Sequence, residues 1–423
     1  MLGALRHRNY RLYLIGQIIS TIGTWMQSVA LPWLALELTH SGLLVGLVLA
    51  AQFTPVLLGS QFGGVVADRY RKRTVLLVTQ SLFTLPSFAL FALSATGHAS
   101  YWMVLVAALA IGTINLFDVP ARQSFVIEMV GRQDLMNAIA LNSSVFNAAA
   151  VVGPAIAGVL IGTVGVPLCF LANSLSYLAA VAALLLMRHL PAVVPEHEEQ
   201  PWLERIAQGV AYARKEPVVG MLLIAVAVFS LFAMTRLTLI PLFADQVLDV
   251  GAQGFGFLLG SMGLGALVGA LTLAFSSGLG ADPRRQFWMG VMWVAALLVF
   301  SVSRVYALSL ISLFVAGYCQ ISFVAAANSR IQTMTPDHLR GRVMALYAQA
   351  LIGVGPIGNL QAGALATLLG PPKAMAIGAI IAGAVIVVIR LVKPDVFGPN
   401  QPKRTSSTAA SASTGTSQRS ERV

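Results

Sequence analysis

The stretch "GGVVADRYRKR", residues Gly63–Arg73, places five charged side chains within six positions. In the whole chain only 10% of the residues are Asp, Glu, Lys or Arg. Long apolar segments, at about 43–66 and 74–95, flank the charged positions on both sides. Charges gathered between two apolar segments indicate a short water-facing loop that joins two membrane spans. The five charged residues are Asp68, Arg69, Arg71, Lys72 and Arg73.

The composition of the chain excludes a water-soluble protein. Of its 423 residues 57% are apolar, and the mean hydropathy is +0.79. Soluble domains usually carry about 25% charged residues, far more than this chain. Twelve apolar segments recur, each close to the roughly 20 residues that a helix needs to cross a bilayer. We expect spans at 10–36, 43–66, 74–95, 101–120, 138–163, 167–187, 218–243, 254–277, 286–303, 305–327, 342–369 and 373–392.

A single long polar connection, "RHLPAVVPEHEEQPWLERIAQGVAYARKEP", separates the sixth span from the seventh. Within it Trp202, Ile206 and Val210 recur every four residues, which predicts a short helix lying on the membrane face. The start of the chain runs into an apolar segment longer than the core of a signal peptide, so we expect the first span to be retained. The predicted domains are a six-helix bundle at 1–190, a cytoplasmic linker at 191–217, a second six-helix bundle at 218–393 and a disordered cytoplasmic tail at 394–423.

The basic residues predict the orientation in the membrane, because short cytoplasmic loops collect Lys and Arg. With the N-terminus inside, all of the 27 Lys and Arg residues except Arg236, Arg304 and Lys373 fall on the cytoplasmic side. Both termini and the linker are therefore expected in the cytoplasm. The net charge of +11 is explained by this orientation, and no nucleic-acid partner is expected.

Residue types that carry catalysis or bind metals do not cluster in this sequence. The two cysteines, Cys169 and Cys319, lie in apolar segments, and there is no CxxC or Cys/His group. We therefore expect no metal and no cofactor. A P-loop motif for ATP is missing, as is a nucleophile with a neighbouring base. The sequence thus disfavours both an ATP-driven pump and a membrane-embedded enzyme.

The two halves resemble each other when one is shifted onto the other, which indicates a parallel duplication with a site expected at the midplane between the halves. A shift of 209 places Gln27 on Arg236, five residues before Pro32 and Pro241 respectively. A shift of 205 places Gly153 on Gly358 and Gly158 on Gly363.

The charged loop resembles the pattern G-x-x-x-D-R-x-G-R-K of the major facilitator superfamily, with Arg71 in place of a glycine. The segments 118–160 and 339–347 are similar to the exporter group that includes enterobactin-type siderophore exporters and macrolide efflux proteins. "GPAIAG", Gly153–Gly158, is similar to the exporter motif of the fifth helix. The resemblance implies an all-α membrane protein with twelve transmembrane helices in two pseudo-symmetric six-helix bundles.

The same resemblance implies a conformational latch, in which Asp68 holds the cytoplasmic side closed against the start of the eleventh span. The alternative for the basic residues is that they only anchor the topology. Close helix packing, with or without a gating role, is expected at glycines and a proline of the fifth and eleventh spans. The latch candidates are Gly64, Asp68, Arg69, Lys72, Arg73, Arg122 and Arg342, and the packing candidates are Gly153, Pro154, Gly158, Gly358 and Gly363.

One face of the first span is polar and predicts the wall of a central cavity. Gln17, Thr21, Thr24 and Ser28 share this face at helical spacing, although hydrogen bonds between helices would also explain it. An arginine inside the seventh span, Arg236, is costly unless it is paired or hydrated. It suits an anionic or catecholate substrate, or else it extends to the outer interface. With Gln27, its counterpart in the first half, these residues are the candidates for the substrate cavity.

Two carboxylates lie within or beside the spans and are candidates for carrying a coupled proton, namely Asp118 and Glu37. Asp118 stands four residues before Arg122, the spacing at which side chains on a helix form ion pairs.

These features predict a secondary exporter that moves a small amphipathic molecule, a drug or a siderophore-like metabolite, by proton antiport with alternating access. It would act as a monomer in the bacterial inner membrane, with the lipid bilayer, the proton and the substrate as partners. A proton-coupled importer and a non-transporting receptor or scaffold are the alternatives.

Overall fold

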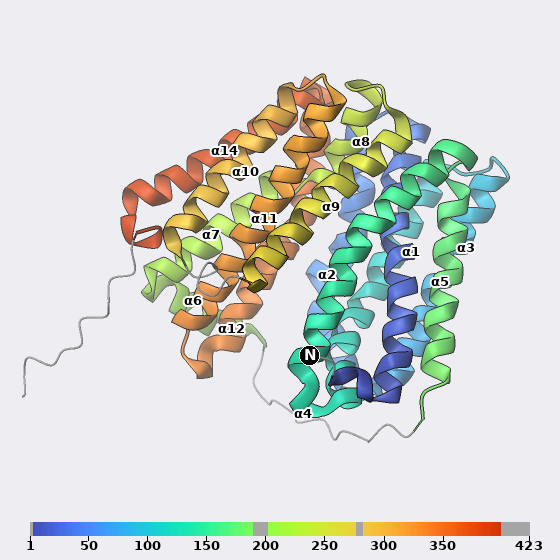
Figure 1. Ribbon diagram of the computed structural model, residues 1–423, viewed down its shortest axis with the longest axis horizontal. Helices are drawn as coiled ribbons and strands as arrows, with labels where there is room; N and C mark the ends of the chain where they lie inside the picture. Colours follow the sequence, from blue (N-terminus) through green and yellow to red (C-terminus); the bar gives the residue numbers. More distant parts are fainter. Residues whose placement is uncertain (1–2, 189–201, 276–281, 399–423) are drawn as a thin grey trace, which may run out of the picture.

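The computed structural model describes residues 3–188, 202–275 and 282–398, and Figure 1 shows their arrangement. Nearly all of the described chain is helical, as expected for segments whose backbone groups cannot bond to water in a bilayer. The helices are α1 (Arg8–Thr39), α2 (Gly42–Arg69), α3 (Lys72–Ala95), α4 (Tyr101–Val164), α5 (Pro167–Leu185), α6 (Trp202–Lys215), α7 (Pro217–Phe232), α8 (Arg236–Gln246), α9 (Gly251–Phe275), α10 (Pro283–Val302), α11 (Tyr306–Met334), α12 (Asp337–Ala348), α13 (Gly355–Leu369) and α14 (Pro371–Val392), with short turns η1 (Ala4–Arg6), η3 (Gln349–Gly353) and η4 (Pro394–Val396).

All twelve expected spans coincide with helices in the described residues, apart from 276–277 at the end of the eighth span, which lie outside them. Eleven continuous helical stretches are long and apolar enough to cross a membrane, and one of them is the 64-residue α4. A straight helix of that length would be about three times as long as the hydrocarbon core is thick. Gly131 divides α4, because its φ of 70° and ψ of 177° lie outside the helical region. The predicted fold class, an all-α membrane protein with two six-helix bundles, is confirmed.

Two of the spans are interrupted near their middle. The seventh span consists of α7 and α8, with Ala233–Thr235 between them, and the eleventh consists of α12, the π-helical turn η3 and α13. Interrupted helices free backbone groups from the regular ladder, and in transporters they occur where the chain lines a cavity. Both interruptions fall in the second half of the chain.

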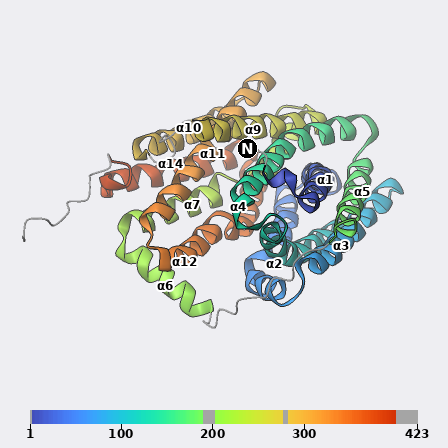
Figure 2. The same ribbon diagram turned by 60° about the horizontal axis from the view of Figure 1, so that its bottom comes forward.

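The halves meet through two pairs of helices, α4 with α9 and α2 with α13 (Figures 1 and 2). The second and fifth spans of each half thus contact the fifth and second spans of the other, as a twofold axis along the membrane normal requires. Small residues allow these helices to approach closely. A Cβ atom added to Gly158 would lie 2.9 Å from the Cα atom of Gly256, and one added to Gly363 would meet the carbonyl of Gly42.

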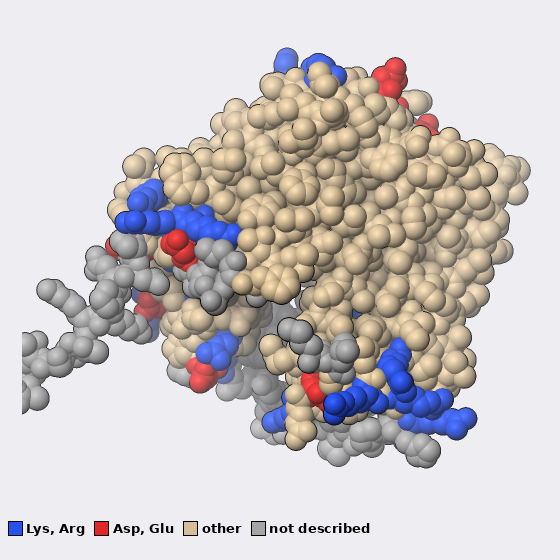
Figure 3. Space-filling model, viewed as in Figure 1, with Lys and Arg blue, Asp and Glu red and all other residues tan. Residues whose placement is uncertain are grey.

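These contacts lie at one end of the molecule, the end with the loops near residues 40 and 370, which we call the closed end. There the Trp33 ring stacks on Phe255 with centroids 5.9 Å apart, and the Leu43 N–H donates to Thr367 Oγ1 at 2.8 Å. At the opposite, open end the halves diverge, and Figure 3 shows a hollow between them. Lys and Arg side chains gather around that open end on the face shown.

Some of the expected domains lie partly outside the described residues. A helix, α6, does occupy the linker region, whereas residues 189–201 and the tail from 399 onward are not described. The domain boundaries at 190, 217 and 393 therefore stay predictions, as does the disorder of the tail.

Replacing Gly158 by Leu should prevent the closed end from forming. Overpacking of this kind costs about 1–3 kcal/mol, roughly a five- to hundredfold change in the population of the closed arrangement. Distances between spin labels on the closed ends of α4 and α9 should lengthen. Val159→Leu, at an exposed neighbouring position on the same helix, is the control and should leave the distances unchanged. Unchanged distances in Gly158→Leu would show that this contact tolerates a large side chain.

Candidate functional site

A buried ion pair lies within the first half, on α4. Asp118 is 1% exposed, and Arg122, one turn later, donates to its Oδ2 from Nε at 2.9 Å and also from Nη2. A lone carboxylate in such a place would be very costly, so a close cation is required. The predicted pairing of these two residues is confirmed.

Side chains from two neighbouring helices complete this pair. On α3, Thr79 Oγ1 and Gln80 Nε2 donate to Asp118 Oδ1 at 2.7 Å and 2.8 Å. On α1, Gln17 Oε1 accepts from Arg122 Nη1 at 2.8 Å. The network therefore joins α1, α3 and α4 through groups that hydrogen-bond to both charges, which is what a buried pair needs to be tolerated.

A cavity of about 10 Å³ adjoins the network, room for about one water molecule. Tyr13, Gln17, Gln80 and Arg122 line it together with apolar residues of α3 and α5. The Oε1 atom of Gln80 is buried here and accepts no hydrogen bond from the described residues. A buried acceptor of this kind usually bonds to water, and the cavity has room for one water beside the ion pair.

The remaining polar residues of the first span differ in exposure. Thr24 is exposed, and its hydroxyl donates to the Ser20 carbonyl at 2.8 Å, while Ser28 donates to the Trp25 carbonyl at 2.7 Å. Thr21 is half-buried.

Gln27 is placed differently from the cavity position expected for it. It is 4% exposed, and its Oε1 accepts from Ser87 Oγ at 2.8 Å and from Asn173 Nδ2 at 2.7 Å. In this structure Gln27 thus connects α1, α3 and α5 inside the bundle, because a polar group on the inward side of α1 finds its partners on the neighbouring helices.

Two residues of the charged loop, Lys72 and Arg73, contact other helices of the first half. Lys72 Nζ lies 2.8 Å from Glu128 Oε1, and both side chains are about a tenth exposed. Arg73 donates to the carbonyls of Leu184 and Leu185 at 2.9 Å and 3.1 Å, at the end of α5. Lys72 and Arg73 therefore fasten the start of α3 to other helices of the same half.

For three other latch candidates the structure gives the exposure or the surrounding space. Arg69 is exposed, Gly64 has open space where a Cβ would stand, and Arg342 lies half-buried in α12. The side chain of Asp68 lies outside the described residues, so the latch itself stays a prediction.

The second proton candidate stands far from the first. Glu37 is exposed near the closed end, where Trp33 Nε1 donates to it at 2.5 Å. Sequence reasoning overlooked Glu128, a nearly buried carboxylate of α4 between the fourth and fifth expected spans, which pairs with Lys72.

The second half repeats part of the network, which sequence reasoning also missed. Arg330 is 6% exposed and donates from Nη1 to Gln286 Oε1 at 2.7 Å. Arg330 lies 208 positions after Arg122, and Gln286 lies 206 positions after Gln80. Ala326 stands where Asp118 stands in the first half, so only the first half has the carboxylate. The internal repeat could have revealed this difference.

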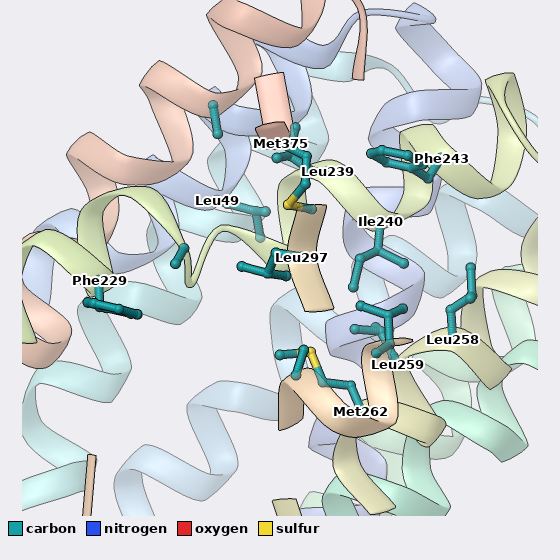
Figure 4. Close-up of a cluster of buried hydrophobic side chains, with 14 of the residues drawn as sticks. Leu49, Phe229, Leu239, Ile240, Phe243, Leu258, Leu259, Met262, Leu297 and Met375 are labelled. Carbon is teal, nitrogen blue, oxygen red and sulfur yellow. The ribbon is translucent and has the colours of Figure 1, made fainter. Parts of the chain in front are cut away.

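A pocket of about 190 Å³ lies between the halves, next to both interrupted spans. Its walls are mainly apolar, and its polar members are Ser230 and Asn359, whose Oδ1 accepts from Thr238 Oγ1 at 3.0 Å. Figure 4 shows how apolar side chains of α2, α7, α8 and α10 pack around the break between α7 and α8. The lining residues are Phe53, Ser230, Met234, Leu237, Leu351, Ile352, Gly355 and Asn359.

Arg236 is the first residue of α8, between the pocket-lining residues Met234 and Leu237. Its side chain lies outside the described residues, so neither pairing nor extension to the interface is assigned to it.

The packing candidates do lie at helix contacts. Gly158 and Gly363 face the other half, whereas Gly153 faces α1 and Gly358 faces α7 within their own halves, and the Pro154 carbonyl lies beside Gly256.

Comparison with known proteins agrees with this architecture. The family model described as "Transmembrane secretion effector" matches residues 1–408. The enterobactin exporter EntS of Shigella boydii serotype 4 is 26% identical over 409 residues, covering 95% of this chain and 96% of that protein, and EntS of Escherichia coli O1:K1 matches equally well.

Solved transporter structures share the fold at low identity. A POT family transporter in complex with a thioalcohol-conjugated peptide superposes with a TM-score of 0.73 at 11% identity, covering 92% of this chain and 96% of that one. The nucleoside transporter NupG gives 0.72 at 12% identity, covering 93% and 100%.

Arg122→Gln should destabilise the chain strongly, because it leaves the Asp118 carboxylate buried without a cation. Breaking one side of such a pair costs about 3 kcal/mol or more in the free energy of unfolding. The double variant Asp118→Asn/Arg122→Gln should recover most of this loss. Thermal unfolding of the purified protein measures both, with Arg69→Gln as an exposed control. If Arg122→Gln were as stable as the unaltered protein, the pair would not hold the three helices together.

Proposed function

Since the chain belongs to the transmembrane secretion effector family of the major facilitator superfamily, we propose that it exports a small amphipathic molecule, a drug or a siderophore-like metabolite, by proton antiport. The observation that carries export is the likeness to the enterobactin exporter over 95% of the chain. The shape of the molecule supports alternating access, because the halves touch at one end and diverge at the other.

The proposed orientation places the open end in the cytoplasm of a bacterium, with the chain in the inner membrane. The Lys and Arg residues around the open end support it. In that orientation this structure corresponds to the state that receives substrate from the cytoplasm. An exporter then closes the open end and separates α4 from α9 and α2 from α13. The monomer contains both halves and needs neither a second subunit nor a cofactor for this cycle.

The proposed substrate site is the pocket between the halves together with the polar face of the first span. Phe53, Met234 and Ile352 provide apolar contacts, and Asn359 provides a hydrogen-bonding group. Such a combination suits an amphipathic molecule. Arg236 begins α8 beside the pocket and would supply a cation for an acidic or catecholate group. Gln17, Thr21, Thr24 and Ser28 would line the opposite wall, and Gln27 would support it from within the bundle.

The proposed proton carrier is Asp118. Its burial, its single cationic partner and the adjoining small cavity support this role. Protonation would remove the negative charge, weaken the hold on Arg122 and leave the guanidinium bonded mainly to Gln17. The contacts among α1, α3 and α4 would then change together with the proton, as coupling requires. Glu37, exposed at the closed end, is the second candidate.

The latch is proposed to depend on Asp68. Lys72 and Arg73 already have partners within the first half, so their loss would disturb the position of α3 before it disturbs closure. Arg122, a further latch candidate, is paired with Asp118 within the first half, and the remaining members, Gly64, Arg69 and Arg342, would act with Asp68 at the open end. An importer is the alternative function, since solved transporters of peptides and nucleosides have the same fold.

A proton-flux assay tests the proposed antiport. Inside-out vesicles that hold a respiration-driven proton gradient would receive a panel of drugs, macrolides and catecholates. We expect one compound class to collapse the gradient rapidly, and Asp118→Asn to abolish the collapse although the protein is inserted normally. Glu37→Gln is the matched comparison. An unchanged response in Asp118→Asn would transfer the role to another carboxylate, and no response to any compound would contradict antiport.

Arg236→Ala should weaken binding of an acidic substrate. Loss of a charge-assisted hydrogen bond of about 1.5–3 kcal/mol raises the apparent KM roughly ten- to hundredfold and leaves the turnover rate unchanged. Initial transport rates against substrate concentration measure both quantities. Arg304→Ala, an exposed position at the closed end, is the control. Equal KM values for Arg236→Ala and the unaltered protein would place Arg236 outside the substrate site.

A further inference from the structure

A second cavity, distinct from the space between the halves, lies among α6, α7 and α12. It is a groove of about 500 Å³, within the range of small-molecule sites. Apolar side chains of all three helices form its walls. They include Val210 and Ala213 of α6, Met221, Ile224 and Ala227 of α7, and Leu346 of α12.

The groove lies at the open end, where the spans leave the membrane. Tyr212 of α6 donates its hydroxyl to the Met334 carbonyl at 2.8 Å, and a Cβ on Gly209 would lie 3.1 Å from the Arg342 carbonyl. These contacts hold α6 against the end of α11 and against α12, and Figure 2 shows α6 next to α12. The helix α7 belongs to a strongly apolar span, and α6 ends in the basic residues Arg214 and Lys215. The groove therefore lies where the hydrocarbon core meets the lipid headgroups.

Arg214 is the single charged side chain that lines this groove among the described residues. An apolar groove with one cationic side chain at its rim suits a molecule that has a hydrocarbon chain and an anionic headgroup. A soluble anion would make no use of the apolar walls, and a neutral apolar compound would make no use of the guanidinium. We propose that the groove binds an anionic phospholipid, with an acyl chain between α6 and α7 and the phosphate at Arg214.

Such a lipid would link the linker helix to the seventh span. The turn at Glu216 joins α6 directly to α7, so an acyl chain between them would hold their relative angle. The proposal is independent of the transported substrate and of proton coupling.

Photo-crosslinking in lipid nanodiscs tests this site with the full chain. The probes are a photoactivatable phosphatidylglycerol and its phosphatidylcholine counterpart, each at a few per cent of the lipid. We expect the phosphatidylglycerol probe to label peptides of α6, α7 and α12 more than the phosphatidylcholine probe does. Arg214→Gln should lower this labelling about tenfold or more, because it removes the charge-assisted hydrogen bond to the lipid phosphate.

Lys215→Gln is the matched control, since it removes the same charge one residue away and outside the groove. It should leave the labelling unchanged. Ala227→Phe fills the groove and should remove labelling of α7 by either probe, and thermal unfolding shows whether this variant is folded.

Three results would overturn the proposal. Equal loss in Arg214→Gln and Lys215→Gln would indicate general attraction to the surface. Equal labelling by both probes would exclude recognition of the anionic head. Displacement of the label by a transported compound, with no preference between the lipids, would make the groove a substrate site.

Discussion

The hydrocarbon core of a membrane accepts and donates no hydrogen bonds, and the rest of this structure depends on that constraint. It forces the backbone into helices and requires every charge between them to find a partner in the protein. The pairs Asp118–Arg122 and Lys72–Glu128 and the contact of Arg330 with Gln286 all satisfy this requirement. Lys72–Glu128 joins α3 to α4, Arg330–Gln286 joins α11 to α10, and the Asp118–Arg122 pair within α4 is hydrogen-bonded to α3 and α1. The polar residues thus contribute to the packing of each bundle.

The distribution of these contacts separates the rigid parts of the molecule from the movable ones. Every ion pair found among the described residues joins two side chains of the same half. Among the described residues, the contact between the halves at the closed end includes close approaches of glycines, as at Gly158 with Gly256, and the stacking of Trp33 on Phe255. A single hydrogen bond from the Leu43 N–H to Thr367 is described there as well. Two apolar surfaces can separate without leaving an unpaired charge. Separating the two partners of a buried ion pair leaves each charge without its partner. This distribution supports the proposed alternating access, in which the two bundles move relative to each other.

The two halves share their arrangement of six spans but differ in chemistry and in the continuity of two spans. Both halves have an arginine on their fourth span and a glutamine on their third, but Asp118 has Ala326 as its counterpart. The interrupted spans lie in the second half alone, beside the pocket. The proposed proton site and most of the proposed substrate pocket therefore lie in different halves, and coupling between them would pass through the relative motion of the two bundles.

The sequence by itself determined what depends on composition and short spacing. Apolar length predicted twelve spans, the polar linker divided them into six and six, and a separation of four residues predicted the Asp118–Arg122 pair, because neighbours on one helix have a known geometry. Only the tertiary structure decided which distant residues meet. It placed Gln27 against Ser87 and Asn173, and the groove beside α6 depends on three helices at once. Spacing along a helix follows from its pitch, whereas contacts between helices depend on crossing angles and rotations that the packing of the whole chain determines.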